Sequence, residues 1–155
     1  MDIICVVLGA DTKKIRTTDS VKLIEYSFSN FKNIDINKKV EEKFESWKNI
    51  NEGRIIIEKG VNNGIKLKLD EYNLKNYPIE NGTEERIIIK VECNMKLVAP
   101  IDENSVIGKL IVLYNENVIS QISVLTAESV KKKGVLDYIF EIYKDYSDYL
   151  ERAIK

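Results

Sequence analysis

The clearest hydrophobic pattern in the chain predicts two strands joined by a polar corner. Apolar residues recur at every second position over 95–101, which is typical of a half-buried strand. Pro100 removes a ladder donor and holds the residue before it extended, so the strand is expected to end there. Residues 102–105 supply turn chemistry. Gly108 then permits a β-bulge or a positive φ, just as a second apolar run begins over 106–112.

The first thirty residues predict one strand followed by one helix. Residues 3–8 form a continuous apolar run rich in β-branched side chains, which favours a strand covered on both faces. A helix is expected from Thr18, with Thr17 or Thr18 as its cap. Its apolar positions recur at helical spacing: Val21, Ile24, Phe28 and Phe31. A strand covered on both faces needs more neighbours than one helix, so this segment is expected to be the end of something larger.

Between residues 33 and 130 the pattern predicts short strands separated by turns. The period changes from helical to alternating at Asn33, and 38–47 is a charged stretch with apolar anchors at Val40, Phe44 and Trp47. Asn–Gly pairs and the Tyr77–Pro78 dipeptide mark turns. Strands are expected at 54–58, 65–69, 86–93, 110–114 and 118–125. Short strands at this spacing are typical of a small sandwich or barrel.

The last segment predicts a long amphipathic helix after the lysine run at 131–133. Its apolar face carries Leu136, Ile139, Phe140, Tyr143, Tyr146, Leu150 and Ile154, and acidic residues outnumber basic ones on the opposite face. One interpretation is a foot in the plane of a membrane interface, with the lysines at anionic headgroups. The other is a helix that packs on its own domain or on a partner. Both interpretations bury the apolar face.

Composition excludes several classes of function. Lys plus Arg number 24 against 25 Asp plus Glu, a net charge of -1, so bulk charge recruits no nucleic acid. The absence of histidine excludes imidazole-based triads and His-bearing zinc sites, and we expect no cofactor and no metal. Cys5 and Cys93 lie inside apolar runs and are interpreted as small core residues. No run is long enough to span a bilayer, and the start at Met1 lacks the basic residues of a secretory signal.

The N-terminal part of the chain resembles a family of cell-wall enzymes. The resemblance rests on Ile4-Cys-Val-Val-Leu-Gly-Ala-Asp11, on Arg16 and on residues 19–31. These closely resemble the closing strand and helix of the penicillin-binding domain in D-alanyl-D-alanine carboxypeptidases.

The rest of the chain resembles the same family in the same order. Residues 95–101, 106–108 and 122–130 are similar to the C-terminal β domain of low-molecular-mass penicillin-binding proteins, the penicillin-binding protein 5 type. In that family, the resemblance implies, the β domain is a small sandwich that stands between the catalytic domain and a terminal amphipathic anchor.

Most of the residues that carry the family's chemistry are missing. That chemistry needs Ser-x-x-Lys, Ser-x-Asn and Lys-Thr-Gly, because an amine must activate the serine and fixed donors must hold the oxyanion. The chain contains neither Ser-x-Asn nor Lys-Thr-Gly. Ser-x-x-Lys occurs at Ser29 to Lys32 and at Ser129 to Lys132, and neither serine maps onto the family's nucleophile. We therefore assign no catalytic residue and expect this chain not to release D-alanine.

We predict a mainly β protein in three parts. Residues 1–32 are a strand and helix remnant, residues 33–130 are a small β-sandwich, and residues 131–155 are an amphipathic helix. In the sandwich, Pro100 and Gly108 are expected to have structural roles. The functional hypothesis is a non-catalytic C-terminal region of a D-Ala-D-Ala carboxypeptidase. It would act as a spacer and docking pedestal at the outer face of the cytoplasmic membrane, against the membrane surface or cell-wall proteins. A second hypothesis is a standalone interaction module that binds a partner or its own copy through the N-terminal strand. A third, an active enzyme, predicts covalent labelling by a fluorescent penicillin.

Overall fold

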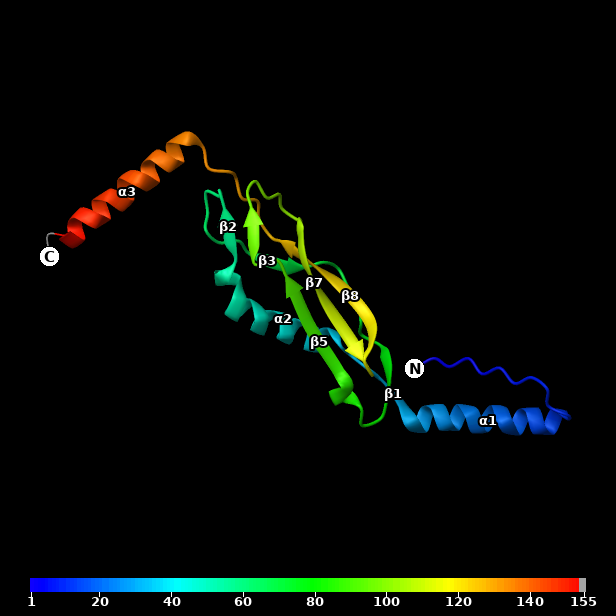
Figure 1. Cartoon of the computed structure of the whole chain (residues 1–155). Coiled ribbons are helices and arrows are strands. Elements are labelled where there is room, and N and C mark those ends of the chain that lie inside the picture. Colours follow the sequence, from blue (N-terminus) through cyan, green and yellow to red (C-terminus); the bar gives the residue numbers. More distant parts are fainter. Residues whose placement is uncertain (154–155) are drawn as a thin grey trace. The chain divides into compact units, whose positions relative to one another are not determined.

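The computed structural model describes residues 1–153 and shows a mixed α/β protein. Helix accounts for 35% and strand for 32%, so the expectation of a mainly β protein is wrong. The main elements follow one another along the chain as in Figure 1: α1 (Lys13–Asn30), β1 (Phe31–Ile34), α2 (Asn37–Asn51), β2 (Ile56–Glu58), β3 (Leu67–Leu69), β4 (Tyr77–Glu80), β5 (Ile87–Cys93), β6 (Lys96–Val98), β7 (Val106–Tyr114), β8 (Asn117–Thr126) and α3 (Val135–Ala153). Short 3-10 turns lie at Glu52–Arg54 and Glu84–Arg86.

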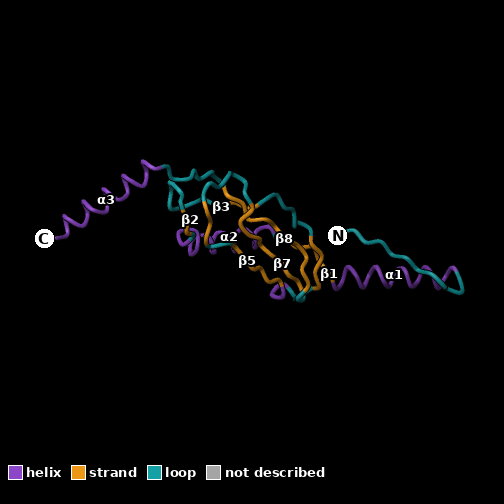
Figure 2. Tube along the Cα trace, turned by 45° about the horizontal axis from the view of Figure 1, so that its top comes forward, coloured by secondary structure: helices purple, strands orange, loops and turns teal. Residues whose placement is uncertain are grey.

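The described strands form one larger sheet and two strand pairs. The larger sheet has the order β3-β8-β7-β5 and curls into an antiparallel half-barrel, in place of the predicted sandwich. β1 pairs with β4 in antiparallel register, and β2 pairs with β6 in parallel register. Figure 2 shows these strands in orange. The predicted alternation of short strands and turns is therefore confirmed, although their layering differs.

The chain divides into two compact units. Four elements, α2, β5, β7 and β8, pass from one unit into the other. The first unit contains residues 1–43, 72–90 and 112–120, and the second contains 44–71, 91–111 and the described residues from 121 onward.

The N-terminal segment of the first unit is extended but is not a strand, which corrects the strand predicted at 3–8. It runs back beside α1 (Figures 1 and 2), and Cys5 Sγ lies 4.0 Å from the carbonyl oxygen of Ser20. Its side chains alternate between half-buried and exposed, and Ile4 is 93% exposed. Among the strands that the structure describes, none pairs with this segment, so its backbone lacks the ladder that defines a strand.

Helix α1 begins at Lys13, earlier than predicted, because Thr12 caps it. The Thr12 hydroxyl accepts a hydrogen bond from the backbone N–H of Ile15 at 3.2 Å. Thr17 and Thr18, the predicted caps, donate instead to carbonyls four residues back, as threonines inside a helix do. No residue of α1 is buried. The helix therefore gains little from packing within this unit.

The fully buried side chains of the first unit come from β4, from β7 and from the residues around the start of α2. Ile36, Val40, Ile79 and Val112 are 0% exposed. The Tyr77–Pro78 dipeptide, predicted as a turn, lies inside β4, and Pro78 stands opposite Asn33 of β1. Proline is tolerated there because a two-stranded sheet has only edge strands, whose outward N–H groups need no ladder partner.

Helix α2 replaces the alternating structure expected after Asn33. Its apolar anchors Val40, Phe44 and Trp47 are four and three residues apart, which places them on one helical face. Val40 and Phe44 are buried, and the Phe44 and Trp47 rings stack with centroids 6.4 Å apart. The helical spacing was present in the sequence, but charged residues between the anchors obscured it.

In the second unit, the predicted polar corner is confirmed and is closed by one buried hydroxyl. Strand β6 ends at Val98, ahead of the cis peptide bond at Pro100, and β7 begins at Val106. Thr126 is 0% exposed, and its hydroxyl donates to the carbonyl of Asp102 at 2.7 Å. The same oxygen accepts the N–H of Ser105 at 2.9 Å. These two hydrogen bonds satisfy the carbonyl of Asp102 and the N–H of Ser105 at the ends of the turn.

Gly108 allows β5 and β7 to approach closely. A Cβ added at Gly108 would lie 2.4 Å from the carbonyl oxygen of Glu92 and 2.7 Å from Cys93 Cα. Its φ is not among the positive ones, so the positive-φ alternative is wrong. Along β7 the buried positions shift from Ile107 to Leu110, three residues on, while β5 keeps strict alternation. Such a phase shift in one strand is the signature of an extra residue, which favours the bulge.

We predict that Gly108→Ala destabilises the protein by about 1–3 kcal/mol, because the new methyl group would overlap backbone atoms that cannot rotate away. Urea denaturation measures this change. Gly53→Ala is the matched control, since no atom lies within 4 Å of its added Cβ. Equal midpoints for the two variants would contradict the close approach.

Candidate functional site

The candidate site is the apolar side of α3, which the described chain leaves exposed. Of the residues predicted for this face, five are described with their side chains and all five are exposed: Leu136 69%, Ile139 55%, Phe140 70%, Tyr143 73% and Tyr146 61%. The side chain of Leu150 and the whole of Ile154 lie outside the described part of the structure. The five side chains therefore do not pack on their own unit.

Sequence reasoning missed four further members of this face. Val135, Tyr138, Ile142 and Tyr149 are also exposed, and at 100° per residue they fall on the same side of α3 as the predicted residues. Together the nine described side chains cover more than half of the helix circumference. The signal was available in the sequence, because all four residues are apolar or aromatic and recur at helical spacing.

The opposite side of α3 is acidic. By sequence, the helical positions opposite the apolar side carry five acidic residues (Asp137, Glu141, Asp145, Asp148 and Glu151) and two basic ones (Lys144 and Arg152), a formal net charge of -3 at pH 7. An anionic surface would repel this side of the helix. Attraction of α3 to an anionic surface therefore has to come from its apolar side, from a basic residue such as Lys144 or from neighbouring segments.

Lys133 ties the first two turns of α3 to the rest of the second unit. Its Nζ donates to both carboxylate oxygens of Glu141, at 2.8 and 2.7 Å, and lies 5.7 Å from the centroid of the Tyr138 ring. Its backbone N–H donates to the carbonyl of Lys59 at 2.7 Å. Asp137 caps the helix by accepting the N–H of Gly134 at 2.7 Å. The root of α3 is thus held by both charge and backbone bonds.

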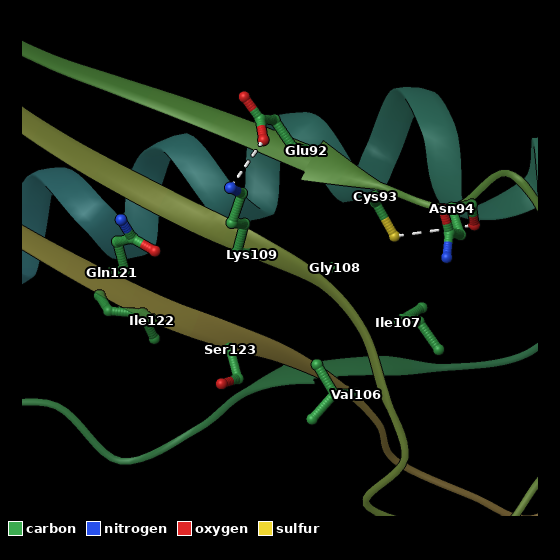
Figure 3. Close-up of a pocket in the computed structure, with 10 residues that line it drawn as sticks. All are labelled: Glu92, Cys93, Asn94, Val106, Ile107, Gly108, Lys109, Gln121, Ile122 and Ser123. Atoms are coloured by element: carbon green, nitrogen blue, oxygen red, sulfur yellow. Dashed lines mark hydrogen bonds and ion pairs between the residues drawn. The ribbon is translucent and has the colours of Figure 1, made fainter.

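A second feature of this unit is a depression of about 550 Å³ next to Gly108 (Figure 3). It is lined by the end of β5, the start of β7 and the middle of β8. Glu92 and Lys109 form an ion pair of 3.3 Å at its rim. Burial raises the pKa of the Cys93 thiol, and a hydrogen bond with the backbone of Asn94 offsets this only in part. A thiol in that state is a weak nucleophile, so the depression offers no activated group.

The two Ser-x-x-Lys patterns lie in different surroundings. Ser29 lies near the end of α1, and the ammonium group of Lys32 pairs with the carboxylate of Glu84. This hydrogen bond with Lys32 is the main reason why the pKa of Glu84 is lowered. Ser129 is exposed after β8, and Lys132 faces Gly60 across an antiparallel bridge.

The described part of the chain holds neither a metal-binding group of side chains nor a membrane-spanning helix. No group of three or more Cys, Asp or Glu side chains there is placed to hold a metal ion. None of the described helices combines the length and the hydropathy needed to cross a lipid bilayer.

Comparison with known proteins places these features in context. Residues 44–132, more than half of the chain, match the family model for penicillin-binding protein 5, C-terminal domain. The chain is also similar to the D-alanyl-D-alanine carboxypeptidase DacF of Bacillus subtilis (strain 168), with 25% identity over 154 residues. That alignment covers 96% of this chain and 36% of the relative, so the chain spans about a third of its length.

Two solved structures are similar over 81% of this chain. One is penicillin-binding protein 5 from Haemophilus influenzae, with 21% identity, a TM-score of 0.43 and 34% of that protein covered. The other is the D-alanyl-D-alanine carboxypeptidase DacD from Francisella tularensis, with 20% identity, a TM-score of 0.48 and 29% covered.

We predict that Cys93 reacts slowly with alkylating reagents near neutral pH. Its raised pKa leaves less thiolate than a free cysteine has, and the thiolate is the reacting form. In a Cys5→Ser variant, the midpoint of the iodoacetamide rate against pH should lie above about 8.5, the usual thiol value. In denaturing urea the midpoint should return to that value. A folded-state midpoint at or below it would show that burial does not control this thiol.

Proposed function

Because the chain belongs to the penicillin-binding protein 5 C-terminal domain family, we propose that it is the non-catalytic C-terminal region of a serine-type D-Ala-D-Ala carboxypeptidase. In this role it serves peptidoglycan maturation in the cell envelope as a spacer and docking pedestal. The family match over 44–132 carries the proposal, and the similarity to about a third of DacF supports it. The catalytic motifs missing from this chain would then reside in the rest of such a protein.

The N-terminal segment and α1 would dock on the catalytic domain. Both leave apolar side chains in water: Leu8 is 88% exposed, Val6 71%, and Phe28 of α1 57%. An extended segment without a ladder partner offers its backbone groups to the edge of another sheet. Such an edge in an adjoining α/β domain would receive the segment, and α1 would cover one face of that sheet.

At the other end, α3 would lie in the plane of the membrane interface. Tyrosine and phenylalanine suit this region because their rings are apolar and the tyrosine hydroxyl can remain hydrated. The charge balance decides whether binding is favourable. Nine exposed apolar side chains, at about 1 kcal/mol each or more, outweigh a repulsion of about 1 kcal/mol for each unit of the net charge of -3 on an anionic surface.

An interaction module that pairs with its own copy is the alternative. The exposed, unpaired backbone of residues 3–8 favours it, because two such segments can pair with each other in antiparallel register. A monomeric mass in analytical ultracentrifugation would exclude this alternative.

We predict that the protein sediments with phosphatidylcholine vesicles and that removal of residues 135–155 abolishes this binding. A double variant, Phe140→Gln with Tyr143→Gln, should bind at least tenfold more weakly, because each ring contributes about 1.5–3 kcal/mol when it is buried. Cosedimentation over a range of lipid concentrations measures the partition coefficient.

The control for this experiment is the double variant Ile88→Gln with Val118→Gln. It also removes two exposed apolar side chains, 46% and 53% exposed, but from strands instead of α3. Its partition coefficient should match that of the unaltered protein. If the unaltered protein stays in the supernatant, or if both double variants lose binding equally, the membrane role of α3 is wrong.

A further inference from the structure

The root of α3 brings together two segments that are far apart in the sequence. Gly60 and Lys132 face each other across an antiparallel bridge. The N–H of Val61 donates to the carbonyl of Lys131 at 2.9 Å, and the N–H of Lys133 donates to the carbonyl of Lys59 at 2.7 Å. These two bonds flank the bridge and fix its register. Lys59, 72 residues before Lys131 in the sequence, thus becomes a neighbour of the lysine run.

This register places three lysines on one face. Residues directly opposite in an antiparallel pair share a face, and successive residues alternate between faces. Lys59 therefore lies opposite Lys133, and both share their face with Lys131 and Val61. Like charges in opposite positions repel, but Lys133 is neutralised by its two bonds to Glu141. Lys59 and Lys131 are exposed and form no ion pair with any described residue.

The sequence enforces this approach through Gly60. A Cβ at this position would lie 2.7 Å from Ile57 Cγ2 and 3.0 Å from both Asn62 O and Val130 Cγ1. Any larger residue would push the segment that carries Lys59 away from Val130 and hence from the lysine run.

Next to these lysines lies a shallow depression of about 290 Å³ with an apolar floor. Val61 and Phe140, 49% and 70% exposed, contribute apolar surface to it, and Lys133 and Lys144 line it together with Asn63. Its two carboxylates are already engaged, Asp137 with the N–H of Gly134 and Glu141 with Lys133. Lys59 and Lys131, on the face that Val61 shares, thus lie beside apolar surface that is continuous with the exposed side of α3, and Lys144 lines the same depression.

We propose that Lys59, Lys131 and Lys144, the lysine patch, bind the phosphate of an anionic phospholipid headgroup in a bilayer, with Val61 and Phe140 against the adjoining apolar region. This rests on the proposed membrane role of α3 and adds a lipid preference to it. The acidic side of α3 opposes an anionic surface, so the electrostatic attraction is confined to Lys144 and to the segments that precede the helix. A soluble anion would gain nothing from Val61 and Phe140, whereas a lipid contacts both the charge and the apolar floor.

The test compares vesicles of phosphatidylcholine with vesicles of equal parts phosphatidylcholine and phosphatidylglycerol. The unaltered chain should bind the anionic vesicles more tightly. The triple variant Lys59→Gln, Lys131→Gln, Lys144→Gln should lose this preference, at about fivefold per lysine and at least tenfold in total. Its binding to phosphatidylcholine alone should be unchanged, since α3 retains its apolar side.

The matched control neutralises Lys22, Lys75 and Lys90, which are also exposed, and changes the net charge by the same amount. It should keep most of the preference for anionic vesicles. The inference is overturned if the patch variant keeps the full preference, or if the control loses as much. Loss of binding by the unaltered chain to both kinds of vesicle would instead refute the membrane role itself, so the two failures are distinguishable.

Discussion

Apolar side chains at both ends of the described chain remain in water, and this constraint determines which surfaces the protein can bind. α1 has no buried residue, and α3 exposes nine apolar side chains. Most helical stability in proteins comes from packing of an apolar face, so α1 and α3 gain little stability from the rest of the described chain. Residues between them supply fully buried side chains such as Ile79 in the first unit and Val124 in the second. The middle of the chain thus holds its own cores, whereas each end calls for a surface that the described chain does not provide.

Close backbone contacts determine where these ends leave the folded part. Gly108 permits β5 and β7 to touch, and Gly60 permits the segment before Val61 to reach Val130 and the lysine run. Thr126 then secures the corner after Pro100 with two short hydrogen bonds. Each contact is local. The contact at Gly60 also fixes the start of α3, because Lys133 bonds to Lys59 through its backbone and to Glu141 through its side chain. A charged, ordered connection of this kind suits a pedestal better than a free linker would.

The sequence predicted most strongly where a single periodicity dominated. The strands on either side of the polar corner after Pro100 and the apolar side of α3 follow from the spacing of apolar residues. Prediction failed where the answer depended on a partner. Residues 3–8 have the composition of a buried strand, but a strand exists only with a ladder neighbour, and none is described here. It also failed at α2, whose charged residues hid a helical spacing of anchors, and at Pro78, which a two-stranded sheet accommodates. The proximity of Lys59 to Lys131 could not be predicted, because it depends on the register of a bridge between Gly60 and Lys132, which are 72 residues apart in the sequence.

Amide hydrogen exchange on the purified chain, with and without phosphatidylcholine vesicles, tests most directly the claim that the two ends serve different surfaces. In solution, the account predicts low protection in α1 and α3 and high protection in β7 and β8, whose core side chains are buried. Vesicles should slow exchange in α3 and leave α1 unchanged, because α1 is assigned to a protein partner. Strong protection of α3 without lipid, or equal gains in α1 and α3 with it, would contradict the account.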